Sequence, residues 1–321
     1  MKRTILFVIP ICISILLLSF SGKNQVQSKP ALLRTLVIDP GHGGIDPGAK
    51  GSFSTEADVS LEVALKFGKA LEEEFPDLKI VYTRTSDVMA GNKRTKDEGL
   101  KYRANLANES GGDLFIAIHC NAAPDIRHRT FIGNKTRTYY TGKGKKRKKV
   151  TRKIPQYRYW TTPNPAHGTE TYIWAVGKND AKVGAVHHNP DDYGEVDSTS
   201  TLELPDPSDP AEKARMLIYA QNFFKKSLQL ADLVEKEFTA TGRFSRGVKQ
   251  RNHTGIWVLQ ATGMPSILVE LGFLSHGEDE KYLNSEQGQA EMVEDLVNAF
   301  RTYKQRIESK SMGNTGEQKG F

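Results

Sequence analysis

Cysteine is scarce in this chain, and its scarcity limits how the fold can be held together. The 321 residues include two cysteines, Cys12 and Cys120. Cys12 lies in an apolar amino-terminal run, so the rest of the chain has one cysteine and cannot form an internal disulfide bond. Core packing must therefore stabilise the fold. Because Cys120 continues the apolar run 114–118, we interpret it as a small buried hydrophobe and not as a nucleophile.

The amino-terminal apolar run, residues 5–20, is shorter than the roughly 20 residues that a membrane span usually needs. Two basic residues precede it and small residues follow it, which is the pattern of a secretory signal. We predict a signal peptide at residues 1–22 and a polar linker at 23–34, with an uncleaved membrane anchor as the alternative. No cysteine lies at a plausible cleavage point, which argues against a lipid anchor. We therefore expect a secreted protein with no transmembrane span after signal removal.

Acidic residues are absent from residues 127–158, which contain 13 Lys and Arg. The other 32 basic residues face all 38 acidic ones, so the net charge of +7 arises from one insertion, residues 124–165. This insertion has no apolar period and contains Gly, Pro and Tyr, so we predict a mobile surface loop. A basic run can bind nucleic acid. In an exported protein we expect no nucleic acid, and anionic cell-wall or outer-surface polymers are better partners for such a run. A merely solvated loop is the favoured interpretation.

The order of the apolar runs predicts an α/β fold. A buried strand at residues 36–38, a helix that begins near Glu56 and a strand at 79–84 form a β-loop-α-β unit, which joins parallel strands. We expect one domain at residues 35–307 and a disordered tail at 308–321. Further strands are predicted at 114–118, 170–175, 256–259 and 266–271, and further helices at 101–108, 210–238 and 278–307.

Two of the predicted strands are each followed by a histidine. Residues 36–48, LVIDPGHGGIDPG, end a strand in a glycine-rich turn that contains His42, and the strand 114–118 leads into His119. In α/β sheets, ligands collect outside the carboxyl ends of the strands. Together with Glu56 at the mouth of a helix, the two imidazoles form a set that can bind zinc and leave a position open for water. The spacing is not the helical H-E-x-x-H signature, and two unrelated histidines bonded to backbone carbonyls are the alternative.

The last apolar run contains a carboxylate. Glu270 stands inside ILVELGFL, and an unpaired carboxylate in that setting costs several kcal/mol unless it is bonded or protonated. Carboxylates with a perturbed pKa cluster at catalytic sites. Glu270 is therefore a catalytic candidate. A structural Glu paired with an Arg or with a backbone amide is the alternative.

Several ordered motifs resemble the zinc-dependent N-acetylmuramoyl-L-alanine amidases of the type-3 family. They are VIDPGHGGIDPGAKG, the Glu56 that follows, RANLAN, DLFIAIHCNAA, GTETY and MPSILVELGFLSHGEDEKYL, and they extend from residue 36 to about residue 303. The resemblance implies a single α/β domain, with a twisted mixed sheet flanked by helices. Two polar insertions, 124–165 and 183–216, interrupt the match. The resemblance also implies that His42, Glu56 and His119 bind one Zn²⁺ per chain and that Glu270 is the catalytic carboxylate.

The same resemblance implies the substrate and the reaction. The substrate is peptidoglycan, hydrolysed at the amide between N-acetylmuramic acid and L-alanine for cell-wall remodelling or daughter-cell separation. A periplasmic location is expected from the family and from the lack of separate wall-binding repeats. Two other readings are a zinc peptidase that cuts the peptidoglycan stem peptides and a non-catalytic cell-wall-binding protein.

An acidic insertion, residues 183–216, falls where related cell-division amidases carry a helix that blocks the zinc site until a protein activator binds. Residues 189–212 hold eight acids and no Lys or Arg, and they end in Asp-Pro-Ala-Glu, a good helix start. We predict that a carboxylate such as Glu203 occupies the open zinc position in an autoinhibited state.

Overall fold

The structure, a computed structural model, describes residues 33–175, 210–251 and 255–314. The predicted signal peptide, most of the linker and most of the acidic insertion, including Glu203, lie outside these residues. Among the helices that are described, none is both long and apolar enough to cross a membrane.

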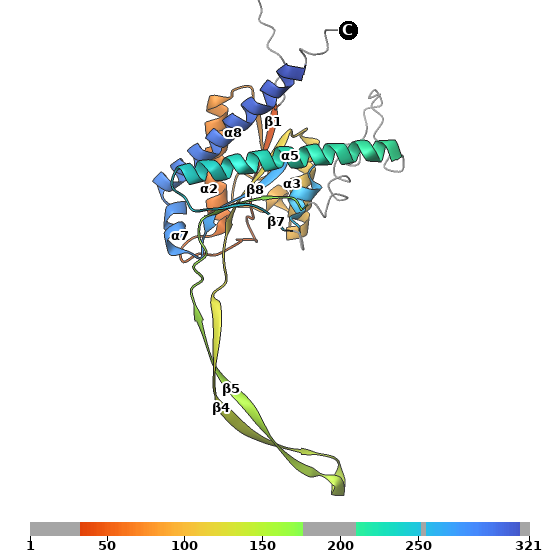
Figure 1. The fold of residues 1–321 in the computed structure, drawn as a ribbon, viewed down its shortest axis with the longest axis vertical. Coiled ribbons are helices and arrows are strands. Elements are labelled where there is room, and N and C mark those ends of the chain that lie inside the picture. The colour runs from red at the N-terminus through yellow and green to blue at the C-terminus, as the bar shows by residue number, and fades with distance from the viewer. Residues whose placement is uncertain (1–32, 176–209, 252–254, 315–321) are drawn as a thin grey trace, which may run out of the picture. The chain divides into compact units, whose positions relative to one another are not determined.

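A six-stranded mixed sheet forms the centre of the fold (Figure 1). Its strands are β1 Thr35–Pro40, β2 Lys79–Tyr82, β3 Leu114–Asn121, β6 Thr169–Ile173, β7 Ser245–Gln250 and β8 Ser266–Phe273. The strand order is β2-β1-β3-β8-β6-β7. The first four of these strands are parallel, whereas β6 runs antiparallel to β8 and parallel to β7. The predicted α/β fold with a mixed sheet is confirmed.

Helices cover both faces of this sheet and complete two core layers. The helices are α2 Glu56–Glu74, α3 Lys96–Glu109, α5 Pro210–Ala240, α6 Trp257–Ala261, α7 Gly277–Leu283 and α8 Glu286–Asn314, with one-turn 3₁₀ helices at Ala90–Asn92 and Gly144–Lys146. Leu36 and Ile38 join the core beneath α2, α5 and α8, and Val37 joins the core on the face that α3 and α6 cover. Successive side chains of a strand point to opposite faces, so β1 contributes to both layers.

Helix α2 carries Glu56 at its amino terminus, and two features fix that end in place. The N-cap residue Thr55 accepts a hydrogen bond from the backbone N–H of Asp58 through its hydroxyl, at 3.3 Å. One face of the helix is fully buried against the sheet, with apolar residues three or four positions apart. These residues are Val59, Val63, Phe67 and Leu71.

The basic insertion is a β-hairpin, so its prediction as a loop is wrong. Strands β4 Ile126–Thr141 and β5 Lys148–Thr162 pair antiparallel in a two-stranded sheet of their own (Figure 1). Its Thr, Tyr, Ile and Val residues favour extended backbone. No residue of either strand is buried, and therefore the sequence shows no alternation of apolar and polar side chains.

Three further predictions need correction. Residues 256–259 lie largely in the short helix α6 and not in a strand; a short buried apolar run does not distinguish the two. Strand β7 was missed because its sequence, SRGVKQ, is polar, as suits a partly exposed strand at the edge of the sheet. The tail was expected to begin at residue 308, but α8 continues to Asn314, and only residues 315–321 lie outside the description.

Candidate metal centre

The loop after β1 places His42 in an unusual backbone conformation. His42 has a φ of 59°, in the left-handed region that non-glycine residues rarely adopt. A Cβ on Gly41 would lie 2.4 Å from the His119 ring, and a Cβ on Gly48 would lie 2.5 Å from Glu56 Oε2. Glycine at these two positions therefore allows the loop to pack directly against both other candidate ligands.

Two buried arginines hold this loop through its backbone carbonyls. Arg84 donates from Nε to Pro40 O at 3.0 Å and from Nη2 to Gly41 O at 2.6 Å. Arg103, on α3, donates from Nη1 to Pro40 O at 2.7 Å, from Nη2 to His42 O, and forms an ion pair with Asp39. The role of neither arginine was predicted from the sequence. Arg103 opens the RANLAN motif, and an Arg in an otherwise ordinary helix was the available signal.

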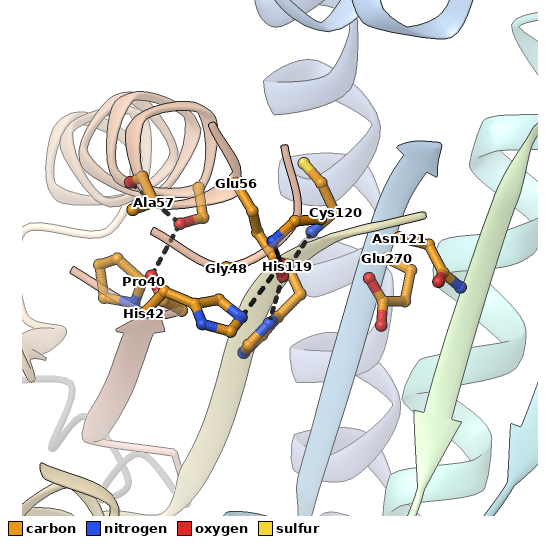
Figure 2. A network of polar contacts seen from close by, with 12 residues as sticks. Pro40, His42, Gly48, Glu56, Ala57, His119, Cys120, Asn121 and Glu270 are labelled. Carbon is orange, nitrogen blue, oxygen red and sulfur yellow. Dashed lines mark hydrogen bonds and ion pairs between the residues drawn. The ribbon is translucent and has the colours of Figure 1, made fainter. Parts of the chain in front are cut away.

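The structure brings the three predicted ligands together. His42 Nε2 lies 3.1 Å from Glu56 Oε2, and His119 Nδ1 lies 2.7 Å from Glu56 Oε1. Figure 2 shows both rings directed at the Glu56 carboxylate, and their centroids are 5.0 Å apart. One potential ligand atom from each residue lies within 4.8 Å of the others. Each imidazole contacts a carboxylate, in contrast to the alternative of two unrelated histidines bonded to carbonyls.

The Glu56 carboxylate is buried and yet charged. Burial alone would raise its pKa, but hydrogen bonds from His119 and His42 outweigh burial and hold the pKa well below its ordinary value. The backbone N–H groups of Ala49 and Cys120 also donate to it, at 2.8 and 3.1 Å. Burial lowers the pKa of His42, but Glu56 and Asp46 reverse this effect and the net pKa is raised. An ionised carboxylate beside two imidazoles is a ligand set that can bind a cation.

This donor set fits zinc. Two imidazole nitrogens and one ionised carboxylate are the ligands of many catalytic zinc sites. His42 Nδ1 contacts Asp46 Oδ2 at 2.9 Å, the outer hydrogen bond that metal-binding histidines usually make, which directs Nε2 toward Glu56. Asp46 also pairs with Lys96 at 2.6 Å. We did not identify Asp46 from the sequence, although it lies four residues after His42 in the same motif.

Glu270 lies beside this set on the neighbouring strand. It is the register partner of His119 between β3 and β8, and its side chain is 5% exposed (Figure 2). Among the described residues, Glu270 Oε2 has no hydrogen-bond partner, and Oε1 lies 3.7 Å from Arg251 Nη2. Burial, with the negative charge of Glu56, raises the pKa of Glu270 to about 8. Of the alternative, a structural Glu paired with an Arg or with a backbone amide, the described residues show an ion pair with Arg251 at 3.7 Å.

A second buried glutamate, Glu170, has several hydrogen-bond and ion-pair partners, unlike Glu270. Glu170, in the GTETY motif, lies opposite Glu270 between β6 and β8. It accepts from Lys249 Nζ and from the Tyr172 hydroxyl, both at 2.6 Å, and it pairs with Arg246. Burial raises its pKa, but these partners lower it further than burial raises it. Glu170 is therefore held as a charged residue, whereas Glu270 is not.

All four predicted residues line one open cavity of about 520 Å³ at the carboxyl edge of the parallel strands. Arg251, Trp257 and Leu100 contribute to its wall. Cys120 also borders the cavity, but it is a buried free thiol whose pKa burial raises well above its ordinary value, so it is not poised as a nucleophile. The cavity thus combines a candidate cation site with a carboxyl group whose pKa is raised.

Replacing Arg103 with Ala should disrupt the loop that carries His42. The change removes the partner of buried Asp39 and several donors to loop carbonyls, so the free energy of unfolding should fall by about 3–5 kcal/mol. Chemical denaturation measures this loss. Lys101→Ala, on the exposed side of the same helix, is the matched control. Equal stability of the two variants would show that Arg103 does not hold the loop.

The raised pKa of Glu270 predicts how stability depends on pH in the metal-free protein. The folded pKa of about 8 exceeds the ordinary value of 4.5, so the folded state loses stability relative to the unfolded state as pH rises between these values. Glu270→Gln lacks this titration. Between pH 5 and pH 8 the free energy of unfolding of the variant should therefore rise relative to that of the wild type, by on the order of a few kcal/mol. Denaturation across this range, with exposed Glu278→Gln as control, should show diverging profiles; parallel profiles would contradict the assignment.

Comparisons with known proteins agree with this geometry. A family model described as N-acetylmuramoyl-L-alanine amidase matches residues 36–302. The germination-specific N-acetylmuramoyl-L-alanine amidase of Bacillus subtilis is 33% identical over 158 residues, covering 46% of this chain and 64% of that protein. The N-acetylmuramoyl-L-alanine amidase AmiC of Escherichia coli is 25% identical over 269 residues, covering 84% of this chain and 52% of that protein. The chain thus spans about half to two thirds of the length of these relatives.

Solved structures share the fold. The CwlD amidase from Clostridioides difficile, determined in complex with the GerS lipoprotein, has a TM-score of 0.52 and 20% identity, covering 84% of this chain and 98% of that chain. At this identity the likeness concerns the fold alone. The family model, however, covers most of the sequence and contains all four residues of the cavity set. The chain therefore belongs to the type-3 family of N-acetylmuramoyl-L-alanine amidases.

Proposed function

We propose that this protein hydrolyses the amide bond between N-acetylmuramic acid and L-alanine in peptidoglycan, and that the reaction depends on zinc. The observation that carries the proposal is the placement of the His42, Glu56 and His119 set in one cavity with Glu270, whose Oε2 lacks a hydrogen-bond partner among the described residues. Family membership supports the bond that is cut. The names of the curated relatives describe the same activity.

Each side chain has a distinct role in this proposal. His42, Glu56 and His119 hold one zinc ion, and Asp46 orients the His42 ring. Bound zinc supplies water with a pKa near 7 and polarises the carbonyl oxygen of the substrate amide. Glu270 accepts the proton of the attacking water and delivers it to the departing alanine nitrogen. A nearby cation lowers a carboxyl pKa, so a pKa of about 8 before metal binding moves toward neutrality, where Glu270 can both accept and donate.

The physiological setting that we propose is the cell envelope. The protein would be exported to the periplasm through its amino-terminal signal and would act in cell-wall remodelling or daughter-cell separation. A protein activator is a further part of the proposal. The CwlD amidase was solved with a lipoprotein partner, which supports the idea that amidases of this fold bind other proteins.

Digestion of purified peptidoglycan tests the activity. The protein should release intact stem peptides with a free L-alanine amino terminus, identified by mass spectrometry, and a chelator should stop the release. Glu270→Gln should reduce the rate by about 10² to 10⁴, the usual contribution of general acid-base catalysis, and exposed Glu278→Gln should not.

The products also separate the competing functions. Fragments cut within the stem peptides would identify a zinc peptidase. Binding of peptidoglycan without any release, by a protein that holds zinc, would instead indicate a wall-binding protein or an inhibited enzyme.

Deletion of residues 186–207 tests autoinhibition by the acidic insertion. If Glu203 or a neighbouring carboxylate occupies the open zinc position, the deletion should raise the basal rate, by on the order of tenfold. The single substitution Glu203→Gln, made with the insertion intact, should also raise the basal rate. A deletion protein that folds and binds zinc but shows an unchanged or lower rate would rule out this role.

A further inference from the structure

The hairpin of β4 and β5 has no role in the candidate site described above. Its strands pair with each other over 16 and 15 residues and lie in a sheet separate from the central one. Every residue of the two strands is exposed or half-buried. Residues 127–158 carry 13 cations and no acid, and in the described part of the chain none of these cations forms an ion pair. A purely structural hairpin needs no such charge.

The register shows that both faces of the hairpin are basic. Directly opposed residues of an antiparallel pair share one face, and the irregularity after Phe131 shifts the pairing by one residue. Cations on the first face are Lys135, Arg137, Lys148, Arg152 and Arg158, and those on the second face are Arg127, Arg129, Lys149 and Lys153. The turn adds Lys143, Lys145, Lys146 and Arg147.

One cross-strand pair sets two like charges against each other. Arg137 and Arg152 are register partners, and like charges directly opposite each other destabilise a hairpin. A bound anion between them would relieve this repulsion. Two guanidinium groups suit a carboxylate or phosphate, which accepts two parallel hydrogen bonds. The pair therefore favours an anionic ligand over a merely solvated surface.

Exposed aromatic rings accompany the cations. Tyr159 is 69% exposed and Phe131 is 52% exposed. Arg129 lies over the Tyr157 ring at 5.1 Å, and Arg147 lies over the Tyr140 ring at 4.5 Å. Rings at an interface bury apolar area while neighbouring charges stay solvated. A ligand with apolar surfaces between its anionic groups fits this pattern better than a simple ion.

The hairpin is rooted beside the catalytic cavity. Strand β3 ends at Asn121, and Ala122, in the cavity wall, lies four residues before β4 begins. Asn164, after β5, donates to Pro124 O at 3.1 Å and closes the base of the hairpin. The chain then enters β6, where Glu170 faces Glu270. A polymer held along the hairpin can therefore also reach the cavity.

We propose that the hairpin inserts into the peptidoglycan network and binds the carboxylates of its stem peptides, keeping the cavity on the polymer. The identity of the polymer rests on the proposed function. Basic side chains on both faces favour a ligand that surrounds the hairpin, as a network does. A membrane surface or a duplex would engage one face and leave the other without a partner.

Sedimentation with purified sacculi tests this binding. Glu270→Gln serves as the background in every binding assay, so that the wall is not consumed. Arg137→Gln, Lys148→Gln, Lys149→Gln and Arg152→Gln, combined, should weaken binding by about tenfold or more. The control combines Lys69→Gln, Lys79→Gln, Lys101→Gln and Lys225→Gln, which neutralise exposed lysines elsewhere and should leave binding unchanged. Equal binding by the two combinations would overturn the proposal.

The chemistry of the wall identifies the ligand. Amidation of the stem-peptide carboxylates should weaken the binding of sacculi by the protein with an unsubstituted hairpin. Its binding should fall to that of the protein with the four hairpin substitutions. Removal of phosphodiester-linked polymers with hydrofluoric acid should not reduce it. Loss of binding only after the acid treatment would overturn the proposal in favour of phosphate-bearing polymers, and tighter binding to DNA than to sacculi would overturn it in favour of nucleic acid.

A soluble substrate keeps this inference separate from the catalytic one. In the chain with Glu270 intact, the four hairpin substitutions should leave the hydrolysis of a small muramoyl-peptide unchanged and should slow the digestion of intact sacculi. A chain that binds sacculi through the hairpin but cleaves neither substrate, even after deletion of residues 186–207, would refute the proposed function and not the binding. Equal loss of both activities would overturn the inference, because the hairpin would then be part of the cavity's own structure.

Discussion

The candidate site depends on two buried guanidinium groups that bind the backbone carbonyls of the loop carrying His42. Arg84 and Arg103 donate to the carbonyl oxygens of three consecutive residues, Pro40, Gly41 and His42. Because the charged groups are buried, their hydrogen bonds are strong and their loss would leave several polar groups unpaired. These contacts keep His42 in a left-handed conformation and direct its ring at Glu56. The candidate ligand His42 is thus positioned by two residues outside the candidate ligand set.

Three carboxylates within the same region are held in different protonation states by their surroundings. Glu56 and Glu170 receive several donors each, and their pKa values are lowered. Glu270 has the same burial but few partners, and its pKa is raised. Such a separation of pKa values supports the proposal that Glu56 binds a cation and Glu270 moves a proton. The sheet produces it by placing Glu270 between His119 on one side and Glu170 on the other.

Short motifs predicted the site better than they predicted the fold around it. His42, His119 and Glu270 were recognisable because each follows or interrupts an apolar run, and Glu56 because it begins a predicted helix. The structure places all four in one cavity. Asp46, Arg84 and Arg103 were not identified, since their roles come from contacts in the folded chain. Asp46 contacts the His42 ring, and the two arginines bind loop carbonyls far away in the sequence. Elements without a buried face were the hardest to predict, as the polar edge strand β7 and the basic hairpin show. A periodic pattern of apolar residues arises from a buried face, and these segments have few or no buried residues.

The most direct test of this account is the position of the metal itself. Anomalous diffraction at the zinc absorption edge, recorded from crystals of the metal-loaded protein, would locate the ion without relying on activity. The account predicts one ion per chain, bound by the side chains of His42, Glu56 and His119 and facing the cavity that contains Glu270. An ion bound at other residues, or held by fewer than two of these three side chains, would contradict it.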